Sequence, residues 1–332
     1  MIVSPNFVRR GRTPSGRRFS FLDALPIENK KRTAILSSMT LTKTRAGELF
    51  VLTEAFLWSL FPVITILTFS AMGPLFSAGI STILSSFFFA GLLTLRGTWS
   101  QLRRKTAWKD VLLASLLIGV VLYGLFFVGL RATTAGNASI MALMEVFFSF
   151  LILGIIVGHE ALDGRHLVGA LCMVGGALLI LLPKSFGWHS GDLLIVLAIA
   201  FGPIGNLHAQ RARKIVSAEC IMFVRSTISG CSLLLLALLL EPWPSVAGIS
   251  SSIEFLLING FVMMGFEKIL WQEAIHRIPI TKAISLASIA PLFTLVFARL
   301  FLHERIMAYQ IAAFVPIFVG VVLLTKSRNR EL

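Results

Sequence analysis

The sequence predicts an all-α membrane protein whose ten transmembrane helices form two inverted five-helix repeats. Its composition is more apolar than that of a soluble chain, because 56% of the 332 residues are hydrophobic and 14% are charged, against about 25% charged in soluble domains. Long apolar segments recur along the chain, and its two halves resemble each other at a constant offset. The composition therefore argues against a water-soluble enzyme, and the pattern favours a polytopic membrane protein.

The first 46 residues differ from the rest because they are basic and mostly polar. We expect a disordered cytoplasmic tail that lies against anionic lipid headgroups or, alternatively, a segment upstream of a true translation start at Met39. No apolar segment follows the basic residues, as it would in a secretory signal peptide. Ten apolar segments then follow, each with the length that a membrane crossing needs. They cover residues 47–69, 74–95, 111–130, 134–157, 166–183, 192–209, 217–240, 254–275, 281–301 and 307–325.

Lysine and arginine residues set the predicted orientation, because short cytoplasmic loops carry an excess of both. With both termini in the cytoplasm, the cytoplasmic segments hold 24 of the 30 basic residues and the outer loops hold three. This topology accounts for the net charge of +14, so we expect no nucleic-acid partner. The inner (plasma) membrane of a bacterium is the simplest location for such a chain.

An ungapped offset of 144 residues aligns the two halves. Each copy contains five spans, and because five is odd the second copy must cross the membrane in the opposite direction. Inverted repeats are typical of secondary transporters, which alternate access to a midplane site between the two copies. We assign the repeats to residues 47–188 and 189–326, followed by a cytoplasmic tail at 327–332. The aligned residues include Gly47-Glu48-Leu49 with Gly191-Asp192-Leu193, Asp110 with Glu254, His159-Glu160 with His303-Glu304, and Gly176 with Gly320.

Residues 47–325 resemble the EamA-type exporters of the drug/metabolite transporter superfamily. The resemblance rests on Trp58-Ser59 in the first span, Arg225 in the seventh, residues 283–291 in the ninth, and the two His-Glu turns with the glycines that follow them. It implies a central cavity lined by spans 1, 3, 4, 6, 8 and 9, and export or exchange of small metabolites without ATP. The first repeat departs from the second, because it has Ser81 opposite Arg225 and carries Glu145 and Phe147 near the position of Pro291. We therefore expect a polar group in the first repeat where the second has a helix break.

Ionisable side chains inside the spans are candidates for a substrate or proton pathway, because each costs about 2.5–3.5 kcal/mol to insert. Glu54 in span 1 is similar in placement to the proton- and cation-binding glutamate of the related small multidrug transporters, and Trp58 lies one turn further on. Glu145 lies near the middle of span 4, with Asn137 two turns earlier on the same face. For each of these residues, a structural role in packing is the alternative.

Span 8 contributes Glu267, Lys268 and Trp271. Glu267 and Trp271 share a helix face, and an acid beside an aromatic ring suits a cationic or zwitterionic amine. Neighbours in a helix point about 100° apart, so we expect Lys268 to pair with Glu145 or Glu54 across the cavity, or to reach the cytoplasmic interface, rather than to neutralise Glu267. Tyr123, which the offset aligns with Glu267, would present a hydroxyl from the opposite wall.

These features predict a secondary transporter that exports or exchanges a small amine- or amino-acid-like solute by alternating access. Its partners would be that solute, the lipid bilayer and, if transport is coupled, protons. A proton antiporter of multiple drugs or quaternary cations is the alternative, followed by a membrane scaffold without transport. The sequence lacks the clustered His/Asp or Ser/His groups of a lipid-modifying enzyme, and its three cysteines have no C-x-x-C spacing or histidine cluster. We therefore expect no enzymatic activity, no cofactor and no metal site.

Overall fold

The computed structural model describes residues 27–152, 164–182 and 189–325, and the regular structure in these residues is helical. The described part of the chain contains ten helical segments that are long and apolar enough to cross a membrane. The predicted ten-helix, all-α membrane fold is therefore confirmed. The spans, numbered 1 to 10, are Lys43–Thr68, Pro74–Arg96, Lys105–Arg131, Ala135–Ile152, Gly164–Leu181, Ser190–Arg213, Ala218–Leu240, Val246–Ile275, Lys282–Phe301 and Ala308–Thr325.

Several spans consist of more than one helix. In the first repeat the elements are α1 (Ile27–Thr68), α2 (Pro74–Arg96), the 3-10 turns η2 (Trp99–Arg103) and η3 (Lys105–Ala107), α3 (Trp108–Ala114), the π-helical η4 (Ser115–Leu122), α4 (Tyr123–Arg131), α5 (Ala135–Ala142), α6 (Met144–Ser149) and α7 (Gly164–Leu181). In the second repeat they are α8 (Ser190–Ala200), α9 (Gly202–Arg213), α10 (Ala218–Leu240), α11 (Val246–Leu257), the π-helical η6 (Ile258–Phe266), α12 (Glu267–Ile275), α13 (Ile280–Ala287), α14 (Ala290–Phe301) and α15 (Ala308–Thr325).

The first helix is longer than the sequence predicts. It begins at Ile27 and continues through Pro62 to Thr68, so the basic residues 27–46 are helical and the expectation of disorder does not hold for them. The preceding residues of the expected tail lie outside the described part of the chain. We call the side of the membrane on which α1 begins face A and the side on which α1 ends face B.

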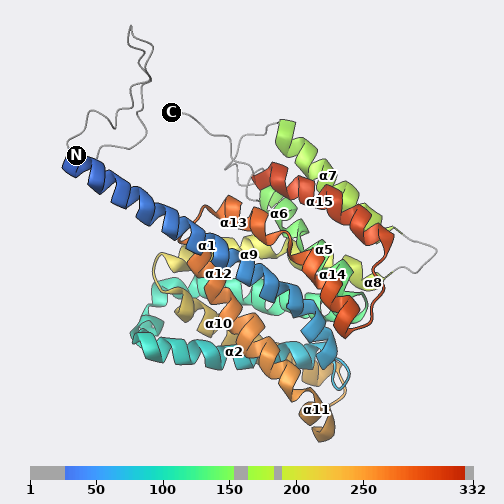
Figure 1. Cartoon of the computed structure of the whole chain (residues 1–332). Coiled ribbons are helices and arrows are strands. Elements are labelled where there is room, and N and C mark those ends of the chain that lie inside the picture. The colour runs from blue at the N-terminus through green and yellow to red at the C-terminus, as the bar shows by residue number, and fades with distance from the viewer. Residues whose placement is uncertain (1–26, 153–163, 183–188, 326–332) are drawn as a thin grey trace.

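Two pairs of helices join the repeats along their length. Helix α2 packs against α10, and α7 packs against α15, as Figure 1 shows for α7 and α15. Glycines permit the second contact, because a Cβ atom at Gly176 would lie 2.7 Å from the carbonyl oxygen of Ala313, and one at Gly320 would lie 2.6 Å from that of Gly169. The offset-aligned glycines of the sequence thus lie where the two repeats meet.

Irregular helix occurs at matching positions in both repeats. The π-helical segments η4 and η6 coincide to within one residue when shifted by 144, and spans 4 and 9 are both interrupted, at Leu143 and at Ser288–Ile289. Pro291 explains the second break, because proline cannot donate the helical hydrogen bond. Span 4 breaks without a proline. At the break the backbone hydrogen bonds join residues three apart instead of four, from Leu143 N to Ile140 O (3.2 Å) and from Val146 N to Leu143 O (3.1 Å). The expectation that a polar group replaces the break in the first repeat is therefore wrong, since that repeat has both.

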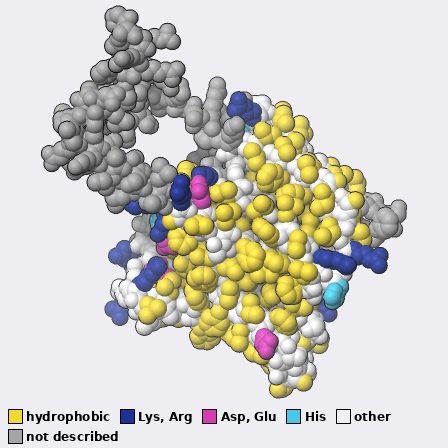
Figure 2. Space-filling model, in the orientation of Figure 1, with side chains coloured by type: hydrophobic (Ala, Val, Ile, Leu, Met, Phe, Trp, Pro, Cys, Tyr) yellow, Lys and Arg dark blue, Asp and Glu magenta, His cyan; other side chains and the backbone are white. Residues whose placement is uncertain are grey.

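The surface is apolar where a bilayer would surround it. Leucines such as Leu95, Leu239 and Leu240 are more than 70% exposed, and hydrophobic side chains cover most of the view in Figure 2, with basic residues near its edges. The main apolar core contains buried residues of both repeats, including Phe61, Phe127 and Ile317. Charged groups inside the spans therefore lie between an apolar outer surface and an apolar core.

Candidate functional site

Lys268 is the centre of a charged group between the repeats. Its Nζ atom lies 2.7 Å from Oε2 of Glu267 and 4.5 Å from the ring centroid of Trp58 on α1. The expectation that Lys268 would not neutralise its neighbour is therefore wrong. The flexible four-carbon chain of lysine lets the ammonium reach the carboxylate although the two Cβ atoms point apart.

Glu54 approaches the same ion pair from α1. Its side chain is 8% exposed, its carboxyl group interacts with that of Glu267, and it also experiences the charge of Lys268. Among the described residues, Oε2 of Glu54 and Oε1 of Glu267 have no hydrogen-bond donor. Buried carboxylate oxygens without a donor carry a large desolvation penalty, so these atoms are available to a proton, a water molecule or a bound solute.

Glu145 lies at the break of span 4 and is half-buried. Its Oε1 accepts a hydrogen bond of 2.9 Å from Nδ2 of Asn206 on α9, and its charge acts on Lys268. Space for its carboxylate comes from Gly202, the first residue of α9, because a Cβ atom there would lie 3.0 Å from Oε1. The breaks of spans 4 and 6 thus meet at this carboxylate.

Tyr123 completes the group from span 3. It is buried, it is the first residue of α4 after the π-helical η4, and it interacts electrostatically with Lys268. Glu267 follows η6 in the same way, and π-helical turns occur frequently at functional sites. We call the whole group, which comes from spans 1, 3, 4, 6 and 8, the charged cluster: Glu54, Trp58, Tyr123, Glu145, Asn206, Glu267 and Lys268.

Two residues predicted for the pathway lie elsewhere. Trp271 packs in a separate apolar cluster with Phe50 and Val51, and the aromatic ring at the ion pair is that of Trp58, which contacts Lys268. Asn137 lies at the face B end of span 4, where its Nδ2 donates to Oδ2 of Asp192 at 3.0 Å. The His-Glu turn at 159–160 lies outside the described residues.

Asn206 was not among the predicted pathway residues. Its only signal in the sequence is an amide in an apolar span, which is equally typical of a solvated helix end. What identifies it is the side chain of Glu145 from another helix, and this contact cannot be read from spacing on one helix. Within the described residues, no group of three His, Cys, Asp or Glu side chains could hold a metal ion.

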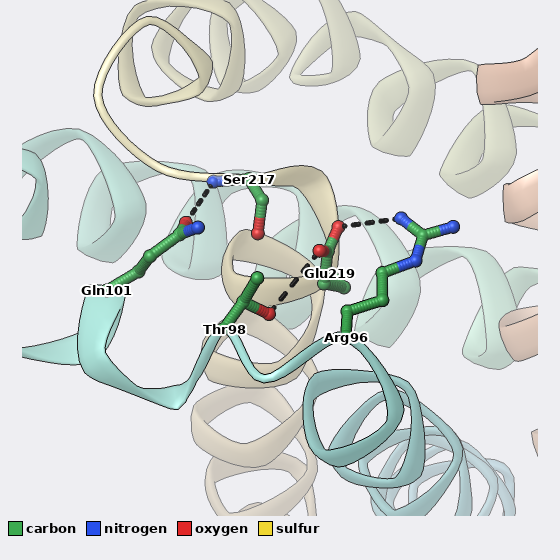
Figure 3. A network of polar contacts seen from close by, with 5 residues as sticks. All are labelled: Arg96, Thr98, Gln101, Ser217 and Glu219. Atoms are coloured by element: carbon green, nitrogen blue, oxygen red, sulfur yellow. Dashed lines mark hydrogen bonds and ion pairs between the residues drawn. The ribbon is translucent and has the colours of Figure 1, made fainter.

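A second polar network fastens α2 to α10 at face A (Figure 3). Glu219 of α10 is 3% exposed; it pairs with Arg96 at 3.3 Å and accepts a hydrogen bond from Thr98 at 3.4 Å. Gln101 accepts a bond of 2.6 Å from the backbone N–H of Ser217. Gln101 thus satisfies one free backbone N–H at the start of α10, and the contacts of Glu219 tie α10 to the end of α2 and the loop after it.

The face B end of the same helix pair is fastened as well. Glu241, which follows α10, accepts bonds from the N–H groups of Leu75 (2.8 Å) and Phe76 (3.0 Å) at the start of α2. Between the two ends, the hydroxyl of Ser85 donates to that of Ser226 at 2.9 Å. Helices α2 and α10 therefore form one unit that is held at both faces.

Glu304 in the turn between spans 9 and 10 reaches into the other repeat. Its Oε1 accepts a 3.0 Å hydrogen bond from the N–H of Ala135, the first residue of α5. Burial raises the pKa of this carboxyl above its ordinary value, and the N–H groups of Ala135 and Gly136 partly oppose that shift. The second His-Glu turn thus has a structural function as a cap of α5.

Ten spans in two inverted repeats, with charged groups held between them, define the class of secondary membrane transporters. The chain belongs to the EamA-like transporter family, whose model matches residues 45–182 and 189–326. It is therefore an integral membrane protein and a transporter of that family, which implies a small-molecule solute.

Several relatives carry names of the same kind. The uncharacterized transporters YoaV and YvbV of Bacillus subtilis are each 23% identical; the alignments cover 67% and 78% of this chain and 77% and 85% of those proteins. The pseudopaline exporter CntI of Pseudomonas aeruginosa is 32% identical over 137 residues, which are 41% of this chain and 46% of that protein. A solved crystal structure superimposes with a TM-score of 0.61 at 18% identity and covers 84% of this chain and 96% of that chain, which supports the fold.

Proposed function

We propose that the protein exports or exchanges a small amine- or amino-acid-like solute by alternating access, and that the charged cluster binds this solute. The observation that carries the proposal is the ammonium group of Lys268, held between the carboxylate of Glu267 and the ring of Trp58. A carboxylate together with an aromatic face is the chemistry that recognises organic ammonium ions. Lys268 takes this position itself, so the ammonium of a solute would bind to the remaining carboxyl groups of the cluster, Glu54 and Glu145.

The charge balance of the cluster supports a solute that carries a positive group. Three carboxyl groups, Glu54, Glu145 and Glu267, surround one ammonium, that of Lys268. Uncompensated charge is costly in apolar surroundings, so a bound cation or protons would stabilise the cluster. Glu145 has only a neutral amide, that of Asn206, as its hydrogen-bond partner among the described residues. We therefore propose that Glu145 binds the ammonium of the solute. Lys268 would then bind the carboxylate of an amino-acid-like solute.

Access to the cluster is consistent with this role. The side chain of Lys268 is 19% exposed although residues of three other spans surround it, and Asn206 is exposed on the face A half of span 6. We further propose that face A is cytoplasmic in a bacterial inner membrane, with both termini on that side. The lysine and arginine distribution of the loops and the bacterial relatives support this location.

Exchange in proteoliposomes tests the function. Purified protein is reconstituted with unlabelled amino acids and amines inside, and uptake of each labelled compound is measured with and without a pH gradient. We expect saturable exchange for one of these compounds and a loss of at least tenfold in Glu145→Gln. Glu254→Gln is the matched control, because Glu254 is an exposed glutamate on α11. Full exchange in Glu145→Gln would remove Glu145 from the proposal, and flux of hydrophobic drug cations alone would favour the multidrug alternative.

A further inference from the structure

We propose that a buried network at the start of α5 is the closed gate of the pathway on face B, an assignment that rests on the proposed transport function. Asn137 is the central residue of this network. Its amide donates to Oδ2 of Asp192 at 3.0 Å, and its Oδ1 accepts a bond of 2.9 Å from Nε2 of Gln310. Thr133 hydrogen-bonds the other carboxylate oxygen of Asp192.

The network joins the two repeats. Asn137 and Thr133 belong to the first repeat, whereas Asp192 and Gln310 lie in the first turns of α8 and α15 in the second. The hydroxyl of Tyr309 also donates to Oδ1 of Asn137, at 3.3 Å. Any movement that separates α5 from α8 and α15 must break these bonds, so opening towards face B requires the loss of the network.

The network is sealed from solvent. Asp192, Asn137 and Gln310 are 0%, 1% and 2% exposed, although all three lie in the first two turns of their helices. Buried amide and carboxylate groups of this kind are stable only while they remain paired. Closure of face B is therefore a state in which each polar group supports the others, and partial opening would leave several of them unpaired.

Comparison with face A shows that the two sides of the molecule differ. The inverted repeat places Glu48 at the position of Asp192 and His166 at that of Gln310. Glu48 is 34% exposed and pairs with Lys282 at 2.5 Å, while His166 is half-buried and its Nδ1 has no partner among the described residues. Equivalent positions thus form a sealed network on face B and an exposed ion pair on face A. A conformer closed to face A would bring Glu48 and His166 into the equivalent network.

Accessibility of a single cysteine tests the gate. The three native cysteines are replaced by alanine, and Asn206→Cys, an exposed position of the charged cluster, reports access for a charged thiol reagent. The reagent is applied to sealed right-side-out and inside-out vesicles. Reporters Lys105→Cys and Val246→Cys, in exposed segments of face A and face B, identify the two sides. The background variants are Asn137→Ala/Gln310→Ala and the single, volume-conserving Gln310→Leu.

We expect the rate of labelling from face B to rise at least tenfold in both gate variants, and the rate from face A to fall. Ser85→Ala/Ser226→Ala is the matched control, because it removes a buried inter-repeat bond of 2.9 Å from the α2–α10 pair; its labelling should not change. If the Gln310→Leu variant elutes as folded protein and its rate of labelling from face B is unchanged, the proposal of a gate is overturned. The labelling assay needs no solute, so the gate and the proposed transport can fail independently.

Discussion

Lys268 connects most of the charged cluster because it is the cation that three carboxyl groups share. Glu267 is its direct partner and is 1% exposed, so loss of the ammonium leaves a carboxylate in apolar surroundings. The same removal at the surface has little effect, since solvent replaces the lost partner. The cost of losing a lysine should therefore depend on where its partner lies.

We predict that Lys268→Met lowers the free energy of unfolding by about 3–5 kcal/mol, as expected when one partner of a buried ion pair is removed. The midpoint of thermal unfolding in detergent measures the effect. Lys282→Met is the matched control: its ion pair with Glu48 is 45% and 34% exposed, so the change should stay within about 1 kcal/mol. The double variant Lys268→Met/Glu267→Gln should recover much of the loss, and equal midpoints for the two single variants would contradict the prediction.

Sequence reasoning at the residue scale identifies which side chains are unusual and leaves open which of them meet. The cost of an ionisable group in a membrane singles out Glu54, Glu145, Glu267 and Lys268, and the structure brings these four residues into one cluster. Spacing places Trp271 on the face of Glu267, yet the structure puts Trp58 beside the ion pair, because the rotation of each helix against its neighbours is set by tertiary packing. Asn206 is missed for the same reason, since its partner lies on another helix.

Helices are positioned in this molecule by small residues and by caps from the opposite repeat. The α7–α15 contact shows the first, because Gly176 approaches the Ala313 carbonyl while its neighbour Gly175 has no atom within 4 Å of the position of a Cβ. Glu241 and Glu304 show the second, because each caps a helix of the first repeat from the second. Of the two adjacent glycines of α7, Gly176 has no room for a side chain, whereas Gly175 has room for one.

We predict that Gly176→Ala destabilises the protein by about 1–3 kcal/mol, the usual cost of overpacking, because the new methyl group would meet a backbone carbonyl. Gly175→Ala should instead be neutral or stabilise by up to about 1 kcal/mol, since alanine is the better helix former. Thermal unfolding of both variants in the same detergent provides the comparison. A stabilised Gly176→Ala variant would show that α7 and α15 do not pack as closely as the structure has them.

The existence and order of the elements follow from hydropathy and the 144-residue offset, but their irregularities do not. Ten apolar segments are visible because each must cross the same hydrocarbon thickness. The π-helical segments before Tyr123 and Glu267, and the break at Leu143, have no comparable signal, since they replace one backbone hydrogen bond by another without a change in composition. The breaks near Pro291 and near Pro203, at the start of α9, are the ones that a residue type could predict.

At the scale of the whole molecule, the two repeats share their arrangement of helices but differ in the side chains that they contribute to the charged cluster. The 144-residue offset places Ala198, Gly202 and Ile289 at the positions of Glu54, Trp58 and Glu145, so the second repeat supplies space where the first supplies acids and an aromatic ring. The face B network and its exposed counterpart at Glu48 and Lys282 add a difference between the two faces. Duplication therefore accounts for the arrangement of helices, and later divergence accounts for the site.

The proposed orientation of the molecule rests on the number of spans together with its basic loops. Ten spans return the chain to the face from which it started, and face A holds the lysine- and arginine-rich segments 96–109 and 211–214. We predict that a green fluorescent protein fused after residue 332 fluoresces in bacterial cells and that alkaline phosphatase fused there is inactive. The same phosphatase inserted after residue 244, between spans 7 and 8, should be active and serves as the control. Active phosphatase at the C-terminus would place face A outside the cell and reverse the assigned direction of the gate.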